Sequence, residues 1–387
     1  MKELEWINRL LMHLNFLNEL SRTRYLAARV PQPRIATLQR TYEVLLTIGG
    51  PVFMKWARMS NESFLKLAAN IASHYIFHNN SNHPQAPVEW QLLVALSNLG
   101  LCGNGGSPHV IAQLFNICKG SVENYTNGCI LAIIETLEKD HVYWPTAEDR
   151  ERYTLACWGR TVFDKCVGFV NGTIFPLATA PSAHKEDYWM RKMVHAVNSL
   201  FVCTANKRII QAVHGWCGSA HDQRVYKNSK PRGVKLYTDP AQFFSPGQYL
   251  LADSANTASN IVVPAFKRPN GRSLPTNKQK FNFESSHQRV AIKHTISMLK
   301  NRWQSLKILS LHVNGAKSAR RVNCWIRACA VLHNYLIEKN DVVWDELTHP
   351  WTSDEPDDED NGLVSGKDPA RRDLIFSRFC RRHGLVN

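Results

Sequence analysis

Apolar residues recur at helical spacing through much of the first 90 residues. Leucines and phenylalanines at 10–17 follow the period of a helix, as do those at 64–71. Ser60 or Asn61 stands just before the second of these segments and is suited to cap it. We therefore predict an N-terminal helical region over residues 1–90.

The pattern from 91 to 145 predicts a helix-turn-helix segment. An apolar stripe at 92–96 is followed by the glycine-rich loop 103–108, where Ser107 before Pro108 marks a helix start. A short middle helix, a turn at 119–121 and a long third helix at 121–139 complete the pattern. Helical hairpins are common, so this spacing supports DNA binding without proving it.

A change to β-rich patterning marks a further domain at 160–340. Alternating or continuous apolar runs predict strands, and longer periodic stretches predict helices. The predicted elements are strands at 167–177, 195–206, 207–216 and 248–256 and helices at 218–229, 285–308 and 322–339. A three-strand meander, a helix, a further strand and a late helix follow the order of an RNase H-like core, so we predict the α/β class.

The last 47 residues, 341–387, read as an acidic linker and a basic tail. The run DEPDDED at 354–360 supplies the acids, and five arginines follow it between 371 and 382. We expect the linker to stay solvated.

Composition narrows the class of partner. The chain has 387 residues with 44% hydrophobic residues, and 47 Lys and Arg against 32 Asp and Glu give a net charge of +15. Such an excess suits a polyanion, of which nucleic acid is the usual one. The ten cysteines form no CxxC pair and several lie in apolar runs, which predicts reduced core residues in an intracellular protein. We find no secretory signal or membrane-spanning segment in the sequence.

Six segments of the chain resemble the PIF/Harbinger transposase superfamily, most of all its fungal members. In order they are FVNGT (169–173), YWMRK (188–192), GWCGSAHDQRVYKNS (215–229), LLADSAN (250–256), FNFESSHQRVAIKHTISMLKNRWQSL (281–306) and IRACAVLHNYLI (326–337). The resemblance implies a DDE transposase core of the RNase H-like type that cuts and joins DNA. It also implies a divalent metal, Mg²⁺ or Mn²⁺, held by an Asp/Asp/Glu set.

Two of these three acids are replaced. The resemblance places the first acid at Asn171, the second at Asp253 and the third at Lys293. It also suggests Asp222 as an auxiliary acid, with a role as helix cap or core hydrogen-bond partner as the alternative, and a metal would be held by Asp253, Asp222 and Asn171. A Lys⁺ near a divalent cation is repulsive by several kcal/mol at an effective dielectric constant of about 20. We therefore predict that catalysis is lost or impaired.

The resemblance also suggests a DNA-facing surface. The predicted DNA contacts are Lys119, Arg191, Lys192, Arg289, Lys300 and Arg302. The main hypothesis is a DNA-binding, catalytically silent relative of a transposase. The alternatives are an active metal-dependent DNA endonuclease and the non-functional product of a decaying transposable element. The family resemblance further suggests a nuclear location, a Myb-like DNA-binding partner protein and a homo-oligomer.

Overall fold

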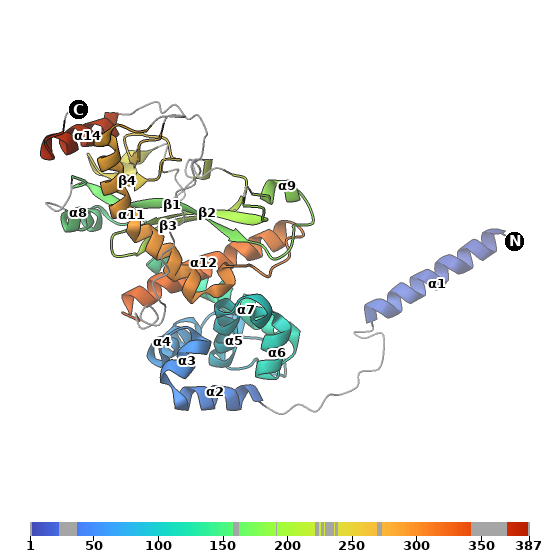
Figure 1. Ribbon diagram of the computed structural model, residues 1–387. Coiled ribbons are helices and arrows are strands. Elements are labelled where there is room, and N and C mark those ends of the chain that lie inside the picture. Colours follow the sequence, from blue (N-terminus) through green and yellow to red (C-terminus); the bar gives the residue numbers. More distant parts are fainter. Residues whose placement is uncertain are drawn as a thin grey trace. The chain divides into compact units, whose positions relative to one another are not determined.

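The computed structural model describes residues 2–22, 37–157, 162–190, 192–220, 224–225, 228, 236, 239–268, 273–341 and 370–385 (Figure 1). Arg191 and Asp222 lie outside these residues. The chain divides into two compact units, 1–37 and 38–387. Within the described residues, no helix combines the length and the apolar character needed to cross a bilayer.

The first unit contains the helix α1 (Lys2–Arg22), which confirms the predicted helical periodicity. Its apolar side chains do not form a core, because Leu10, Leu14 and Leu17 are 44%, 52% and 59% exposed. Among the described residues of this unit, α1 therefore has no apolar partner.

The second unit begins with helices that confirm the rest of the N-terminal prediction. They are α2 (Thr37–Ile48), α3 (Gly50–Ala57), α4 (Asn61–Ile71) and the 3₁₀ turn η1 (Tyr75–Phe77). Ser60 caps α4 by accepting a hydrogen bond from the Ser63 backbone N–H at 3.2 Å. Phe64, Leu67 and Ile71 are fully buried, as their spacing predicts.

Three helices follow at the predicted helix-turn-helix. They are α5 (Val88–Gly100), α6 (Pro108–Phe115) and α7 (Lys119–His141), with the 3₁₀ turn η2 (Gly103–Gly106) between the first two. Ser107 caps α6 as predicted. The predicted turn at 119–121 is wrong, because these residues form the first turn of α7. The chain instead turns at Asn116, whose φ of 49° is left-handed, and Cys118 caps α7.

A five-stranded mixed sheet forms the centre of the second unit (Figure 1). After the helix α8 (Ala147–Cys157), the strands are β1 (Cys166–Pro176), β2 (Ala196–Cys203), β3 (Ile209–Cys217), β4 (Tyr249–Ala252) and β5 (Val262–Pro264). Their order is β3-β2-β1-β4-β5. The first three form an antiparallel meander, and β4 and β5 continue parallel to β1. The predicted strands are confirmed, whereas β5 was not predicted.

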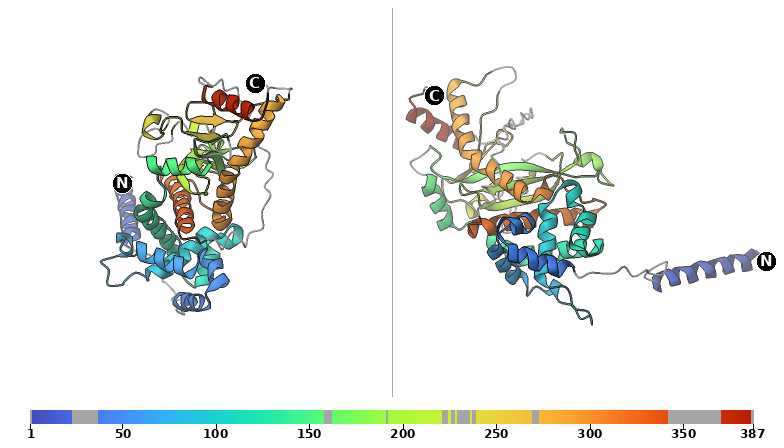
Figure 2. Two further views of the ribbon diagram at one scale, coloured as in Figure 1. Left: turned by 90° about the vertical axis from the view of Figure 1, so that its left-hand side faces the viewer. Right: turned by 60° about the horizontal axis from the view of Figure 1, so that its bottom comes forward.

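Helices cover one face of this sheet. After the short elements α9 (Lys185–Tyr188) and η4 (Pro240–Gln242) come α11 (Thr276–Arg302), η5 (Gln304–Leu306) and α12 (Ala316–Glu338). Figure 2 shows α11 and α12 beside the strands. One core joins the sheet face of Phe169 and Leu251 to α11, α12 and the N-terminal helices, and a smaller core with Trp144, Val170 and Phe243 lies on the other face. The predicted boundaries near 90, 145 and 160 therefore lie within one compact unit.

The basic end of the chain is more than a tail. Residues 370–382 form the helix α14 (Ala370–Arg382), and its Ile375, Phe376 and Phe379 are buried against β5 and α11. The Phe376 and Phe379 rings lie 5.6 and 5.5 Å from the Phe281 ring. The apolar spacing of these residues, hidden among arginines, was the signal for this helix. The predicted acidic linker lies outside the described residues.

Candidate functional site

Strand register brings the first two predicted acid positions together. In the parallel pair of β1 and β4, Phe169 lies opposite Leu251. Asn171 follows Phe169 by two residues within β1, so alternation turns it to the same face of the sheet, and Asp253 follows Leu251 by two residues along the neighbouring chain. Asp253 is the first residue after β4, where the strand gives way to a turn. The predicted neighbourhood of Asn171 and Asp253 therefore follows from the register.

Asp253 is held within its own turn. Its Oδ1 accepts hydrogen bonds from the Ala255 backbone N–H at 3.2 Å and from Asn256 Nδ2 at 2.5 Å. Asn256 is buried, and its backbone N–H also donates to the Asp253 carbonyl at 3.3 Å. One oxygen of the single remaining carboxylate therefore already has two donors. The contact of Asn256 was not anticipated from the sequence.

A buried cation faces this site from α11. Arg289 is 2% exposed, and its Nη2 donates to Asn171 Oδ1 over 3.4 Å. Its Nε is also buried and has no hydrogen-bond partner among the described residues. Lys293 follows one helical turn later, half-buried, so it lies on the same side of α11 as Arg289. Among the described residues, the three predicted acid positions and Arg289 together carry one carboxylate and two cationic side chains.

These residues do not fit a pair of divalent cations. Mg²⁺ prefers carboxylate oxygens, and two-metal chemistry needs several of them close together. In the part of the chain that the structure describes, no group of three or more His, Cys, Asp and Glu side chains could hold a metal ion. The amide oxygen of Asn171 accepts a hydrogen bond from Arg289, so Asp253 is the one carboxylate of the predicted metal ligand set among the described residues.

Several predicted DNA contacts are internal. Arg289 and Arg302 are 2% and 6% exposed, and Arg302 donates to the Asp341 carbonyl at 2.8 Å, so both predictions are wrong. A guanidinium buried in the core cannot reach a phosphate group. Lys300 is half-buried and donates from Nζ to the Ile174 carbonyl at 3.0 Å, which directs it toward the sheet. Lys119 and Lys192 are exposed.

The predicted recognition helix is largely covered. α7 packs against α5 and α6 on one side and against α12 on another. Near its start, Asn127 accepts a hydrogen bond from Arg321 of α12 at 2.9 Å. A recognition helix must present one face to the DNA groove. Lys119 and Asn124, near the start of α7, are exposed.

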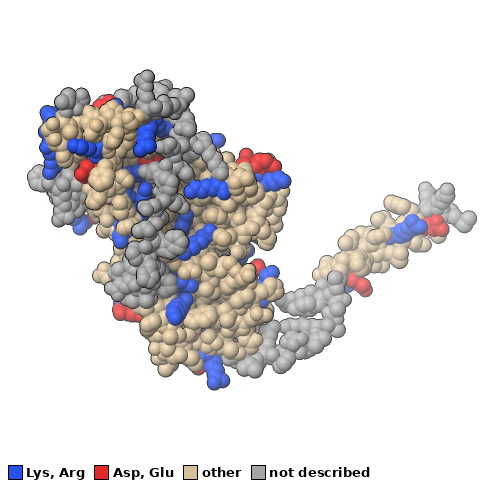
Figure 3. Space-filling view, viewed as in Figure 1, with Lys and Arg blue, Asp and Glu red and all other residues tan. Residues whose placement is uncertain are grey.

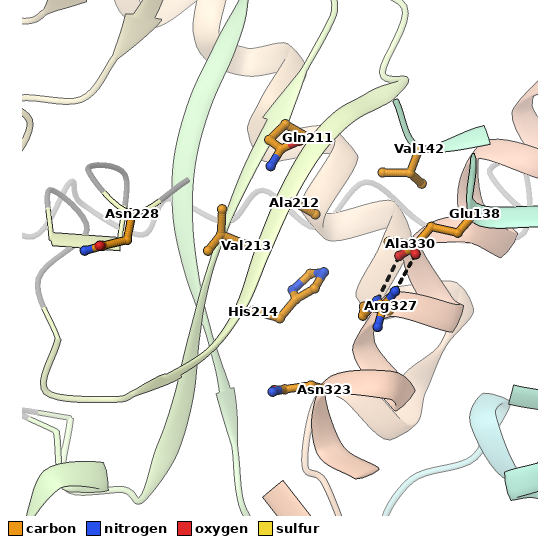
Figure 4. Close-up of a pocket in the computed structure, with 10 residues that line it drawn as sticks. All are labelled: Glu138, Val142, Gln211, Ala212, Val213, His214, Asn228, Asn323, Arg327 and Ala330. Atoms are coloured by element: carbon orange, nitrogen blue, oxygen red, sulfur yellow. Dashed lines mark hydrogen bonds and ion pairs between the residues drawn. The ribbon is translucent and has the colours of Figure 1, made fainter. Parts of the chain in front are cut away.

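A polar cavity of about 450 Å³ lies beside β3, away from the acid positions (Figure 4). His214 on β3 points into it, and burial, with a smaller effect of Arg327, lowers the pKa of this histidine to about 3. Arg327 in turn forms a two-pronged ion pair with Glu138 of α7. Because its carboxylate is already neutralised and its imidazole is uncharged, this cavity does not replace the missing acids.

Comparison with known proteins gives a consistent picture. Residues 170–334 match the DDE superfamily endonuclease family. The chain is 22% identical to "Protein ALP1-like" of Arabidopsis thaliana over 329 residues, which span 80% of this chain and 74% of that protein. It is 24% identical over 208 residues to "Putative nuclease HARBI1" of Mus musculus and 25% identical over 210 residues to that of Homo sapiens. The two HARBI1 matches each span 52% of this chain and 55% of the relative. No solved structure matches the chain.

Proposed function

The chain belongs to the Harbinger-type DDE endonuclease family, and on this premise we propose that it is a DNA-binding member whose nuclease chemistry is silent. The observation that carries the proposal is the positive charge at the predicted acid positions. A buried guanidinium bonds to Asn171 at the first acid position, and Lys293 stands at the third.

The charge at the acid positions is the physical reason why we expect no nuclease activity. Three carboxylates offset the charge of two metal ions and of the phosphate between them. Among the described acid positions Asp253 is the one carboxylate, while Arg289 binds Asn171 and Lys293 stands at the third position, so these charges would repel a divalent cation rather than bind it. Asp222, the proposed auxiliary acid, lies outside the described residues. Even if it joined Asp253, the site would have two carboxylates against the positive charges of Arg289 and Lys293.

The sheet supports the finer assignment to an RNase H-like core. An antiparallel meander followed by two parallel strands, with helices packed on its face, is the arrangement that the motif order predicts. The register of β1 and β4 and the contact of α11 with Asn171 through Arg289 are consistent with that assignment.

The DNA-binding part of the proposal is supported by charge outside the acid site. The net charge is +15, and Lys119, Lys192 and Lys307 are exposed. Contacts of this type bind phosphates and release counterions, so affinity should fall steeply with salt. A nuclear location is part of the same proposal.

The first experiment is a nicking assay on supercoiled DNA in Mg²⁺ or Mn²⁺. We expect no cleavage above background. Cleavage by the native protein that is abolished by Asp253→Ala would contradict the proposal, because it would show that this carboxylate still works in catalysis.

The second experiment restores the acids with Asn171→Asp and Lys293→Glu together. We expect Mg²⁺ or Mn²⁺ to raise the melting temperature of this double variant and not that of the native protein. The matched control is Asn124→Asp with Lys119→Glu, which makes the same two exchanges at exposed positions of α7. If the metal stabilises native protein, control and restored variant alike, the acid positions are misassigned.

A further inference from the structure

Cationic side chains from three parts of the chain meet where α14 docks. We call Lys165, Lys278, Arg371 and Arg372 the α14 basic cluster. Lys165 precedes β1, Lys278 lies in the first turn of α11, and the two arginines open α14. Figure 3 shows Lys and Arg side chains around α14, at the upper left of the view.

Hydrogen bonds to neighbouring carbonyl groups bring the first pair of cations together. Lys165 donates to the Pro246 carbonyl and Arg371 to the Gly247 carbonyl, each at 3.4 Å. A Cβ placed at Gly247 would lie 3.2 Å from Lys165 Nζ and 3.5 Å from Arg371 Nη1. Both charges therefore converge on one loop.

The second pair is gathered by an aromatic ring. Arg372 Cζ lies 4.3 Å and Lys278 Nζ 5.0 Å from the centre of the Phe266 ring. Phe266 is 8% exposed and packs against Phe376 of α14. Because the ring is buried, it can orient the two cations but cannot stack on a base.

Among the described residues, only Arg372 of the cluster has a carboxylate partner. Arg378, further along α14, forms an ion pair with Asp164 through two hydrogen bonds of 3.2 and 3.3 Å. Among the described residues, no carboxylate pairs with Lys165, Lys278 or Arg371, and Asp373 lies 3.7 Å from Arg372 Nε. The Nε atoms of Arg371 and Arg372 are buried without a hydrogen-bond acceptor in the described part of the chain.

We propose that the α14 basic cluster is a binding site for the phosphate backbone of duplex DNA. Convergent cations that are exposed or half-buried suit phosphate oxygens, and the buried ring excludes base stacking. α14 is fixed by its apolar face, so the cations are presented by a packed element. The duplex as ligand rests on the proposed function; the convergence of the cations does not.

The test measures binding of a fluorescent 20-base-pair duplex by anisotropy across a series of KCl concentrations. The variant is Lys165→Gln with Lys278→Gln, which leaves α14 intact. The matched control, Lys55→Gln with Lys139→Gln, removes two exposed lysines of α3 and α7. Each lost phosphate contact lowers the slope of log affinity against log salt by about 0.9. We expect a drop of about 1.8 in the cluster variant and none in the control, with unchanged melting temperatures.

The outcomes separate the two proposals. If the native protein binds the duplex but cluster variant and control keep the native slope, the cluster is not a DNA site and the proposed function stands. If the native protein does not bind duplex DNA at all, both proposals fail. If the cluster variant loses affinity only for duplex RNA, the cluster serves another polyanion and the assignment to DNA is overturned.

Discussion

Replacing Asn171 alone by aspartate tests the electrostatics of the acid site without any metal. The new carboxylate would face Arg289, whose Nη2 already lies 3.4 Å from the Asn171 oxygen and whose Nε has no acceptor among the described residues. At 3.4 Å and an effective dielectric constant of about 20, two unit charges attract by about 5 kcal/mol.

Two costs reduce that gain. The new carboxylate must lose water in a half-buried position, and it stands beside Asp253. A hydrogen bond with two charged partners usually contributes about 1.5–3 kcal/mol, against about 1 kcal/mol for a neutral one. We therefore expect Asn171→Asp to raise the free energy of unfolding by about 1–2 kcal/mol at pH 7 in EDTA.

The pH dependence of the unfolding free energy tests whether the new carboxylate pairs with Arg289. Arg289 should hold the pKa of the new carboxyl below the ordinary value of about 3.9. The added stability is then complete above that value and is lost as the pH falls through the lower folded value. Urea unfolding between pH 7 and pH 3 measures the gain in stability and its loss at low pH. As a control, Asn124→Asp at an exposed position of α7 should change stability by less than about 0.5 kcal/mol. A gain that appears only with Mg²⁺ would refute the reasoning, because the carboxylate would then be pairing with metal instead of Arg289.

Three further predictions concern the scaffold. Burial lowers the pKa of His333 to about 4, so this histidine takes up its proton more readily in the unfolded chain and destabilises the fold as the pH falls from about 6.5 toward 4. His333→Gln should therefore reduce the loss of unfolding free energy between pH 6.5 and 5 by about 2 kcal/mol, as measured by urea titrations. Phe379→Ala should cost about 3 kcal/mol of α14 docking, seen as lost hydrogen-exchange protection of α14 with the sheet still protected; equal loss in both would contradict this. Gly168→Ala should lower the melting temperature strongly, because its Cβ would lie 2.5 Å from the Cys203 carbonyl oxygen in β2; an unchanged melting temperature would show that the strands can separate there.

The sheet was largely predictable because its strands are apolar runs separated by turn residues. The hairpin turn at Ala205-Asn206 fixed the meander, and the parallel pairing that places Asp253 beside Asn171 follows from the motif order. β5 was not predicted, since three residues are too short for a period to be recognised.

The burial of Arg289 was harder to predict, although the sequence carries a signal. The buried stripe of α11 runs through Phe281, Ser285, Arg289, Ile292, Ile296 and Leu299, a regular spacing of three or four residues. Arg289 occupies a core position of that stripe, but its charge led to its prediction as a DNA contact. Charge normally implies solvent, and only the partner across the interface, Asn171, shows why this guanidinium is inside.

The same contacts explain how a nuclease site can lose its acids while the fold survives. The site is positioned by apolar packing of Phe169, Leu251 and Ile292, none of which depends on charge at the acid positions. Without metal, three close carboxylates repel one another, and a site that carries only one of them avoids that repulsion. Stability in EDTA should therefore rise with Asn171→Asp alone and fall again when Lys293→Glu is added. Only Mg²⁺ should restore it, and a double variant as stable in EDTA as the single one would mean that Lys293 lies too far from the other two positions to interact with them.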